Sequence, residues 1–175
     1  MIYKIFYDKM SGDGNGNEFV ELPTNPFPDI LLPAMNSDFE KINDTRPRKI
    51  ITRDDAGGDI FPDFFYDGAF PLFSEKIFYI MNNIGLRDVL KIDVEIIDEI
   101  DDISKPYVLI IPSRIQMFNS MGIINNEEYN IFKNADNIHD TSIYISSMLK
   151  KAFDEVKPLG MKILPYEEEL IRRWK

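Results

Sequence analysis

The feature that most restricts the fold of this chain is a pair of apolar segments separated by a short acidic segment. The first, VLKIDVEI at residues 89–96, alternates apolar and charged side chains, and the second, PYVLIIP at 106–112, is almost wholly apolar. Alternation with a period of two is typical of a strand with one buried face. Because the connection between the segments is short, they are predicted to pair as antiparallel strands.

Two other segments have the spacing of amphipathic helices. Residues 74–84 begin with Ser74, a favourable N-cap residue, and residues 147–157 follow Ser146 in the same role. Apolar residues recur three and four positions apart on one face of each segment. They are Ile77, Ile80, Met81 and Ile84 in the first, which Gly85 is expected to end, and Met148, Leu149, Ala152, Phe153 and Val156 in the second, which Pro158 and Gly160 are expected to end. We expect the two faces to pack into one core.

The rest of the chain is predicted to consist mainly of short strands and loops. A hairpin is expected from residues 2–7 and 19–22, followed by an extended, proline-rich, loop-rich segment at 23–47. Further short strands are expected at 49–55, 129–135, 143–145 and 161–165 and a last short helix at 166–175, whereas 113–129 fits neither period. The fold class is therefore α+β, a single domain over residues 1–175 with a mainly antiparallel sheet and two principal amphipathic helices.

The segment SGDGNGNE at residues 11–18 has the composition of a ligand-binding loop. A calcium loop that starts at Asp13 needs Gly at its sixth position and Glu at its twelfth, and Glu18 and Thr24 stand there. A dinucleotide-binding loop needs a third Gly, where this chain has Asn17, and a helix after the loop, where prolines follow. We therefore expect a turn that reverses the chain between two strands and binds neither calcium nor phosphate.

Composition and charge limit the classes of partner. The 175 residues are 44% hydrophobic, which suffices for one core, and they include no Cys. The net charge of −10 opposes binding to nucleic acid and to anionic membrane surfaces, and it suits a basic protein partner. The first residues are too polar for a signal peptide, and no apolar run approaches the ~20 residues that span a bilayer. We expect a cytoplasmic protein without a membrane anchor.

Few residues are suited to catalysis or metal binding. His139 is the only His, and a nucleophile–base arrangement would have to combine it with Ser142 or Asp140, although NIHDTS is equally typical of a turn. A zinc site lacks Cys and His ligands. Neighbouring carboxylates such as Asp54 with Asp55 could share a proton or bind a divalent ion, but such pairs are usually solvated. We expect no catalytic residues, no metal and no cofactor.

The densest group of carboxylates is the candidate partner-binding site. Asp93 and Glu95 are expected on the strand face opposite Ile92, Val94 and Ile96. The whole group consists of Asp93, Glu95, Asp98, Glu99, Asp101 and Asp102. It forms either a solvated sheet edge or a landing surface for a basic partner. In the same way, Tyr166 and Trp174 either pack on their own domain or anchor an interface.

The order of several segments resembles a family of bacterial immunity-type domains that accompany polymorphic, contact-delivered toxins. The segments are DIFPDFF, FPLFSEKIFYIM, VLKIDVEII, PYVLIIP, NIFKNADN and IYISSMLKKAFDEVKPLGMKILP, within residues 59–166. The chain departs from the family pattern at Lys133, where Arg is common, and at Ile163, where Phe is common. The resemblance leaves residues 1–58 unassigned. It implies a cytoplasmic protein that binds and neutralises a cognate toxin, and it supplies no catalytic residues.

Two alternatives to an immunity-type protein remain at the level of sequence. One is a small metal- or carboxylate-dependent enzyme of unknown substrate, and the other is a homo-oligomeric structural protein. The genes on either side discriminate between them: a toxin gene immediately upstream favours immunity, and metabolic genes favour an enzyme.

Overall fold

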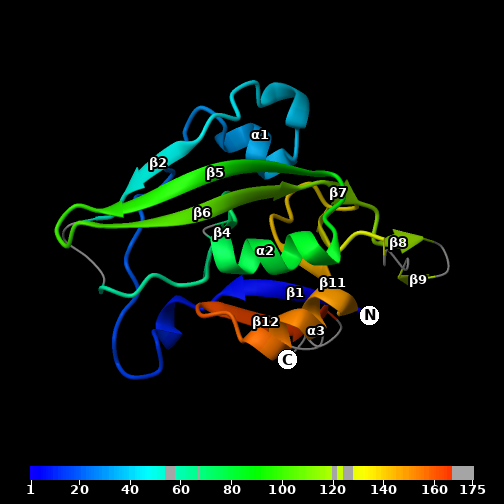
Figure 1. Cartoon of the computed structure of the whole chain (residues 1–175). Coiled ribbons are helices and arrows are strands. Elements are labelled where there is room, and N and C mark those ends of the chain that lie inside the picture. The colour runs from blue at the N-terminus through cyan, green and yellow to red at the C-terminus, as the bar shows by residue number, and fades with distance from the viewer. Residues whose placement is uncertain (54–57, 67, 120–121, 124–127, 167–175) are drawn as a thin grey trace.

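The antiparallel pair expected from residues 89–112 is present as strands β5 and β6 (Figure 1). The computed structural model describes residues 1–53, 58–66, 68–119, 122–123 and 128–166. Strand β5 (Val89–Asp98) and strand β6 (Ile103–Pro112) are paired over their whole length, from Val89 opposite Pro112 to Asp98 opposite Ile103. Both strands extend further than predicted into the acidic segment between them, so that only the four residues 99–102 form the turn.

This pair lies at the centre of a sheet whose strand order is β2-β5-β6-β4-β3 among the described residues. Strand β2 (Arg48–Ile51) runs parallel to β5, and strand β4 (Leu72–Ser74) runs antiparallel to both β6 and strand β3 (Phe64–Phe65). The strand predicted at residues 49–55 therefore ends at Ile51, and its Asp54 and Asp55 lie outside the described residues.

A second sheet has the order β12-β1-β11-β10-β7 within the same ranges. Strand β1 pairs antiparallel with β11 on one side and with β12 on the other, and β7 runs parallel to β10. The strands are β1 (Ile2–Tyr7), β7 (Arg114–Ile115), β10 (Ile131–Asn134), β11 (Ile143–Ser146) and β12 (Met161–Pro165), and a separate small pair consists of β8 (Phe118–Asn119) and β9 (Gly122–Ile123). The predicted helix at residues 166–175 falls almost entirely outside the described part of the chain.

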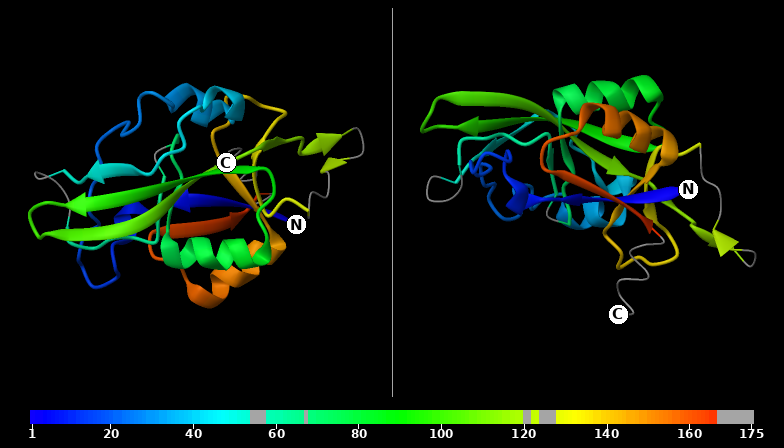
Figure 2. Two further views of the ribbon diagram at one scale, coloured as in Figure 1. Left: turned by 45° about the horizontal axis from the view of Figure 1, so that its top comes forward. Right: turned by 90° about the horizontal axis from the view of Figure 1, so that it is seen from below.

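Both predicted amphipathic helices are present and share one core as expected, but Met148, predicted on the apolar face of the second helix, is 58% exposed. Helix α2 (Glu75–Ile84) and helix α3 (Ser147–Val156) lie side by side (Figures 1 and 2). Their buried residues pack into a cluster between the two sheets: Ile77 and Met81 from α2, and Leu149 and Phe153 from α3. The backbone amide of Leu149 donates to the Ser146 hydroxyl at 3.2 Å, which confirms the predicted N-cap of α3.

The predicted N-terminal hairpin is wrong. Phe19 forms an isolated parallel bridge with Ile60, and the Val20 amide donates to the Ile60 carbonyl at 3.0 Å. Neither residue pairs with β1, because both edges of β1 are already occupied by β11 and β12. A strand with two paired edges has no backbone groups left for a third neighbour.

The proline-rich segment is less extended than predicted, because it contains a short helix. Helix α1 (Leu31–Asn36) is followed by a 3-10 turn at Phe39–Lys41. Pro33 is tolerated in α1 because it lies in the first turn, where a backbone amide has no partner within the helix. Figure 1 shows α1 on one side of β5 and β6 and α2 on the other side.

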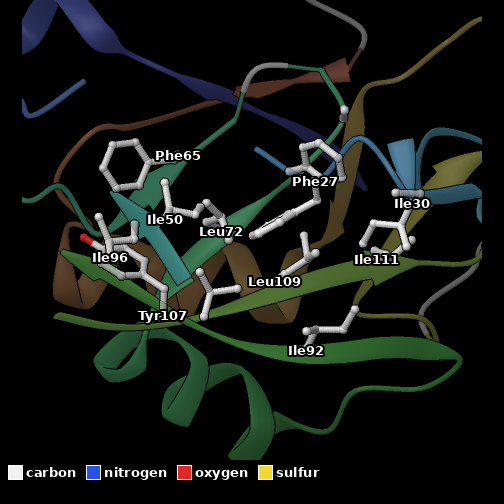
Figure 3. Packing of buried hydrophobic residues seen from close by; sticks show 14 of the residues in the cluster. Phe27, Ile30, Ile50, Phe65, Leu72, Ile92, Ile96, Tyr107, Leu109 and Ile111 are labelled. Carbon is white, nitrogen blue, oxygen red and sulfur yellow. The ribbon is translucent and has the colours of Figure 1, made fainter. Parts of the chain in front are cut away.

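The central sheet therefore has a core on each side. Figure 3 shows side chains from β5 and β6, among them Ile92 and Leu109, on the side of the sheet where Phe27 and Ile30 of the N-terminal third lie. The described residues of the N-terminal third thus share a core with the rest of the described chain, and together they form a single α+β domain with mainly antiparallel sheets. None of the helices in the described ranges combines the length and the apolar character needed to cross a bilayer.

Candidate functional site

The hairpin of β5 and β6 separates its apolar and acidic side chains as predicted. Ile92, Val94 and Ile96 are buried in the core that contains α1. Asp93 and Glu95 lie on the opposite face, where Asp93 is exposed and Glu95 is half-buried. Alternation along the strand thus places two carboxylates of the predicted partner-binding group on one open face.

Asp98 differs from the other carboxylates of this group, because its side chain turns back on the hairpin. The residue is only 8% exposed, and its carboxylate accepts hydrogen bonds from the amides of Ile100 at 2.9 Å and Asp101 at 3.3 Å. A short side chain that accepts from the backbone two residues later stabilises a turn. Asp98 therefore orders the turn, and the surface open to a partner consists of the remaining carboxylates.

The tip of the hairpin is acidic, with an apolar residue at its centre. Glu99, Asp101 and Asp102 are exposed, and none of them forms an ion pair with another described residue. Ile100 between them is 68% exposed. Figures 1 and 2 show that the tip extends past the N-terminal end of α2, clear of the second sheet. Asp102 takes the left-handed conformation, with φ of 53°, that closes the turn.

A groove lies beside the hairpin, between its open face and the start of α2. It has a volume of about 410 Å³, and its acidic lining consists of Glu75, Asp93 and Glu95. Glu95 accepts from the Ser104 hydroxyl at 2.7 Å and pairs with the Lys49 ammonium at 3.0 Å. The hydrogen bond from Ser104, and then Lys49, lower the pKa of Glu95. Lys49 offsets one carboxylate of the groove, Arg48 in its lining pairs with Asp29, and the side chains of Glu75 and Asp93 are exposed.

The sequence did not indicate the structural roles of two cationic residues, the buried Lys133 and the half-buried Arg114. Lys133 is 0% exposed, and its ammonium donates to the carbonyls of Ala34 at 2.9 Å and Met35 at 3.3 Å. These carbonyls belong to the last turn of α1, where the regular helical bonding ends, and the Ala34 carbonyl also accepts from the Ser37 amide at 3.4 Å. Burial, and then the neighbouring Arg114, lower the pKa of Lys133 to about 7. A Lys within the apolar run IFKN is the only sequence signal of this arrangement.

Arg114 fastens the same end of α1 to a distant loop. Its guanidinium donates to the carbonyls of Met35 at 2.9 Å, Asn134 at 2.6 Å and Ile138 at 3.0 Å. It also lies within hydrogen-bond distance of the carbonyls of Asn36, Asn137 and Asp140. The five donors of a guanidinium can serve several carbonyls at once. Together, Arg114 and Lys133 form a cationic clamp between residues 34–36 and 134–140.

His139 is an exposed turn residue in the structure. Its amide donates to the side chain of Asn137 at 3.0 Å. The nearby Asp140 carboxylate accepts from the Ser142 amide at 2.9 Å and from the Tyr144 hydroxyl at 2.6 Å. The Asp140 carboxylate is thus bonded to Ser142 and Tyr144, and His139 is bonded through its backbone amide.

The side-chain hydrogen bonds described within the loop at residues 11–18 centre on Asp13. The Asp13 carboxylate accepts from the amide and the side chain of both Asn15 and Asn17, at 2.8 to 3.4 Å. The hydrogen bond from the Asn17 side chain is the main reason that the pKa of Asp13 is lowered. In the described part of the chain, no three His, Asp or Glu side chains gather closely enough to hold a metal ion.

The two aromatic anchors considered from the sequence have different outcomes. Tyr166 packs edge-on against Tyr144, with ring centroids 5.5 Å apart, so it covers its own domain. Trp174 lies outside the described residues. A scan against models of known protein families and a search of curated proteins each returned no match.

Proposed function

We propose that this chain is an immunity-type protein that binds and neutralises a cognate toxin through a protein–protein interface and catalyses no reaction of its own. The observation that carries the proposal is the exposed tip of the β5–β6 hairpin, where Glu99, Asp101 and Asp102 surround Ile100. The family resemblance of residues 59–166 supports it. The place of action would be the cytoplasm, where an incoming toxin meets its immunity protein.

The partner expected for this tip is basic and concave. Carboxylates on a projecting turn attract a positively charged surface over a long range and increase its association rate. A central apolar side chain such as Ile100 is suited to a desolvated pocket on the partner, with the carboxylates as a polar rim. Glu75 and Asp93 extend the negative surface along the adjacent groove.

The test is coexpression with the toxin encoded by a neighbouring gene, followed by measurement of association with the purified toxin. The variant Glu99→Gln/Asp101→Asn/Asp102→Asn removes three charges from the tip. We expect slower association than wild type at low salt and convergence of the two rates at high salt, because screening at ~0.15 M salt acts beyond about 8 Å. Asp98 is kept, so that the turn stays ordered.

A second triple variant provides the matched control. Glu40→Gln/Asp59→Asn/Glu155→Gln removes the same number of charges from exposed positions outside the hairpin. It should keep an association rate close to wild type. Equal slowing by both variants would indicate a general effect of net charge and would contradict the proposed surface.

A third variant, Ile100→Ser, tests the apolar contact. We expect faster dissociation of the toxin with little change in the association rate, because short-range packing acts mainly on dissociation. Full protection of cells by Ile100→Ser together with the triple variant would contradict an interface at the tip. A neighbourhood of metabolic genes without a toxin would favour the alternative of a carboxylate-dependent enzyme.

A further inference from the structure

A second cavity lies apart from the hairpin, at the end of β1. Its volume is about 310 Å³, and it is lined by residues from β1, β3, β4 and the segment 20–26. Its buried lining consists of Val20, Phe65, Phe70 and Leu72. Figure 3 shows Phe65 and Leu72 as part of the core beside β5 and β6. The cavity therefore has fixed apolar walls, and a volume at the lower end of the range for small-molecule sites.

Two hydroxyls of the cavity lining make no hydrogen bond with a described residue: that of Thr24, which is exposed, and that of Tyr7, which is half-buried. The Tyr7 ring is held between Phe19 and Phe65, with centroid distances of 6.2 and 5.6 Å. Its hydroxyl makes no hydrogen bond with any described residue, whereas the hydroxyl of Tyr66, which also lines the cavity, donates to the Thr141 carbonyl. A half-buried phenol without a partner is ready to donate to a ligand.

The charged groups at the cavity are paired with each other, so the Tyr7 hydroxyl is the half-buried donor that is left for a ligand. Lys9 and Glu21 pair with each other, and the Arg53 amide fixes the Glu21 carbonyl at 3.0 Å. Burial, and then the Glu21 charge, raise the pKa of Tyr7 to about 12, so the phenol keeps its proton at neutral pH. An ion pair that is already closed gives little attraction for a charged ligand.

We propose that this cavity binds a small, uncharged, planar apolar molecule that presents a carbonyl-type oxygen to the Tyr7 hydroxyl. The aromatic and aliphatic walls favour the apolar body of such a molecule, and the unpartnered phenol selects an acceptor over a hydrocarbon. The volume limits the ligand to about one ring with a short substituent. The site shares no residue with the hairpin groove and does not depend on the proposed function.

The experiment compares two probes of the same shape. Acetophenone carries a carbonyl oxygen, and α-methylstyrene has a methylene group in its place. Both are titrated into ¹⁵N-labelled protein, and amide chemical shifts are followed. Acetophenone should bind with a Kd on the order of 1 mM, as suits a ligand of this size. The largest shifts should occur at Val20, Leu22, Phe65 and Tyr66, which line the cavity.

The variant Tyr7→Phe isolates the hydroxyl, since the ring stays in place. It should weaken acetophenone binding by roughly three- to tenfold, as for the loss of one hydrogen bond, and leave α-methylstyrene binding unchanged. Tyr79→Phe, on the exposed side of α2, should alter neither probe. Leu22→Trp should block both probes by filling the cavity, with the fold checked by thermal unfolding. Equal weakening of both probes by Tyr7→Phe, or no saturable shifts at these amides in wild type, would overturn the proposal.

Discussion

Single buried or half-buried charged side chains bond the backbones of separate segments in this protein. Lys133 and Arg114 hold carbonyls of α1, and Asp98 holds amides of the hairpin turn. Backbone groups outside regular pairing need partners, and charged side chains form stronger hydrogen bonds than neutral ones. At the scale of the residue, these contacts are where a single substitution has a measurable effect.

Lys133 should make stability depend on pH in the alkaline range. Its pKa is about 7 in the folded protein and near 10.5 in the unfolded chain. Between these values the unfolded state binds a proton that the folded state lacks, so the free energy of unfolding rises with pH. Below about pH 7 both states are protonated, and this dependence disappears.

The measurement is urea unfolding of wild type and Lys133→Met from pH 6 to 10. The stability of wild type relative to the variant should increase by on the order of 1 kcal/mol per pH unit above pH 7. Lys151→Met, at an exposed position on α3, should show no such slope relative to wild type. A constant difference between wild type and Lys133→Met across the range would contradict the lowered pKa.

Phe153 should contribute strongly to stability. It is 1% exposed and lies in the core shared by α2 and α3. Truncation of a buried Phe leaves a cavity and typically costs about 3–5 kcal/mol. Phe153→Ala should therefore lower the Tm by many degrees in thermal unfolding. Met148→Ala serves as control, because Met148 is on the same helix but 58% exposed, and it should shift the Tm little.

At the scale of the element, local periodicity predicted α2, α3, β5 and β6, because each is defined by its own spacing of apolar residues. The pairing of β1 could not be predicted in this way. Its neighbours β11 and β12 lie more than 130 residues away in the chain, and competition among strands for the two edges of β1 decides the partners. The prediction of an N-terminal hairpin was wrong for that reason.

The candidate site follows the same division between local and distant information. Alternation along β5 predicted the outward direction of Asp93 and Glu95. The alternation gave no indication that the Asp98 carboxylate would accept from backbone amides of the turn. It also did not indicate that Lys49 from β2 would lie beside Glu95. Those contacts depend on the exact length of the strands and on the parallel pairing of β2, which composition does not encode.

The hairpin turn should loosen when the Asp98 carboxylate is removed. Asp98→Ala takes away the acceptor for the amides of Ile100 and Asp101. We expect the free energy of unfolding to fall by about 1 kcal/mol and the hydrogen exchange of these two amides to become faster. Asp98→Asn keeps an acceptor oxygen and should stay close to wild type. Exchange rates at Ile100 and Asp101 that do not change in Asp98→Ala would show that the β5–β6 pairing alone orders the turn.

At the scale of the whole molecule, the β5–β6 sheet separates two cores, and the cationic clamp joins segments across the fold. The clamp connects residues 34–36 with 134–140, which belong to different thirds of the chain. The two segments should therefore respond together when the clamp is weakened.

Arg114→Met tests this coupling. The substitution keeps an apolar stem and removes the donors to the carbonyls of Met35, Asn134 and Ile138. Hydrogen exchange followed by mass spectrometry should accelerate in peptides that cover both segments. Arg46→Met is the matched control, because Arg46 is exposed and pairs only with the neighbouring Asp44 in the described structure. Acceleration in one segment alone would contradict a shared clamp.

The continuous pairing of β5 with β6 also bears on the entropy of association. A flexible loop that becomes ordered in a complex loses backbone and side-chain freedom, and this loss reduces affinity. The tip at residues 99–102 is instead fixed by ten paired positions and by the Asp98 carboxylate before any partner arrives. A partner that binds Ile100 and its neighbours would meet a preorganised surface, so that most of the contact energy remains available for affinity.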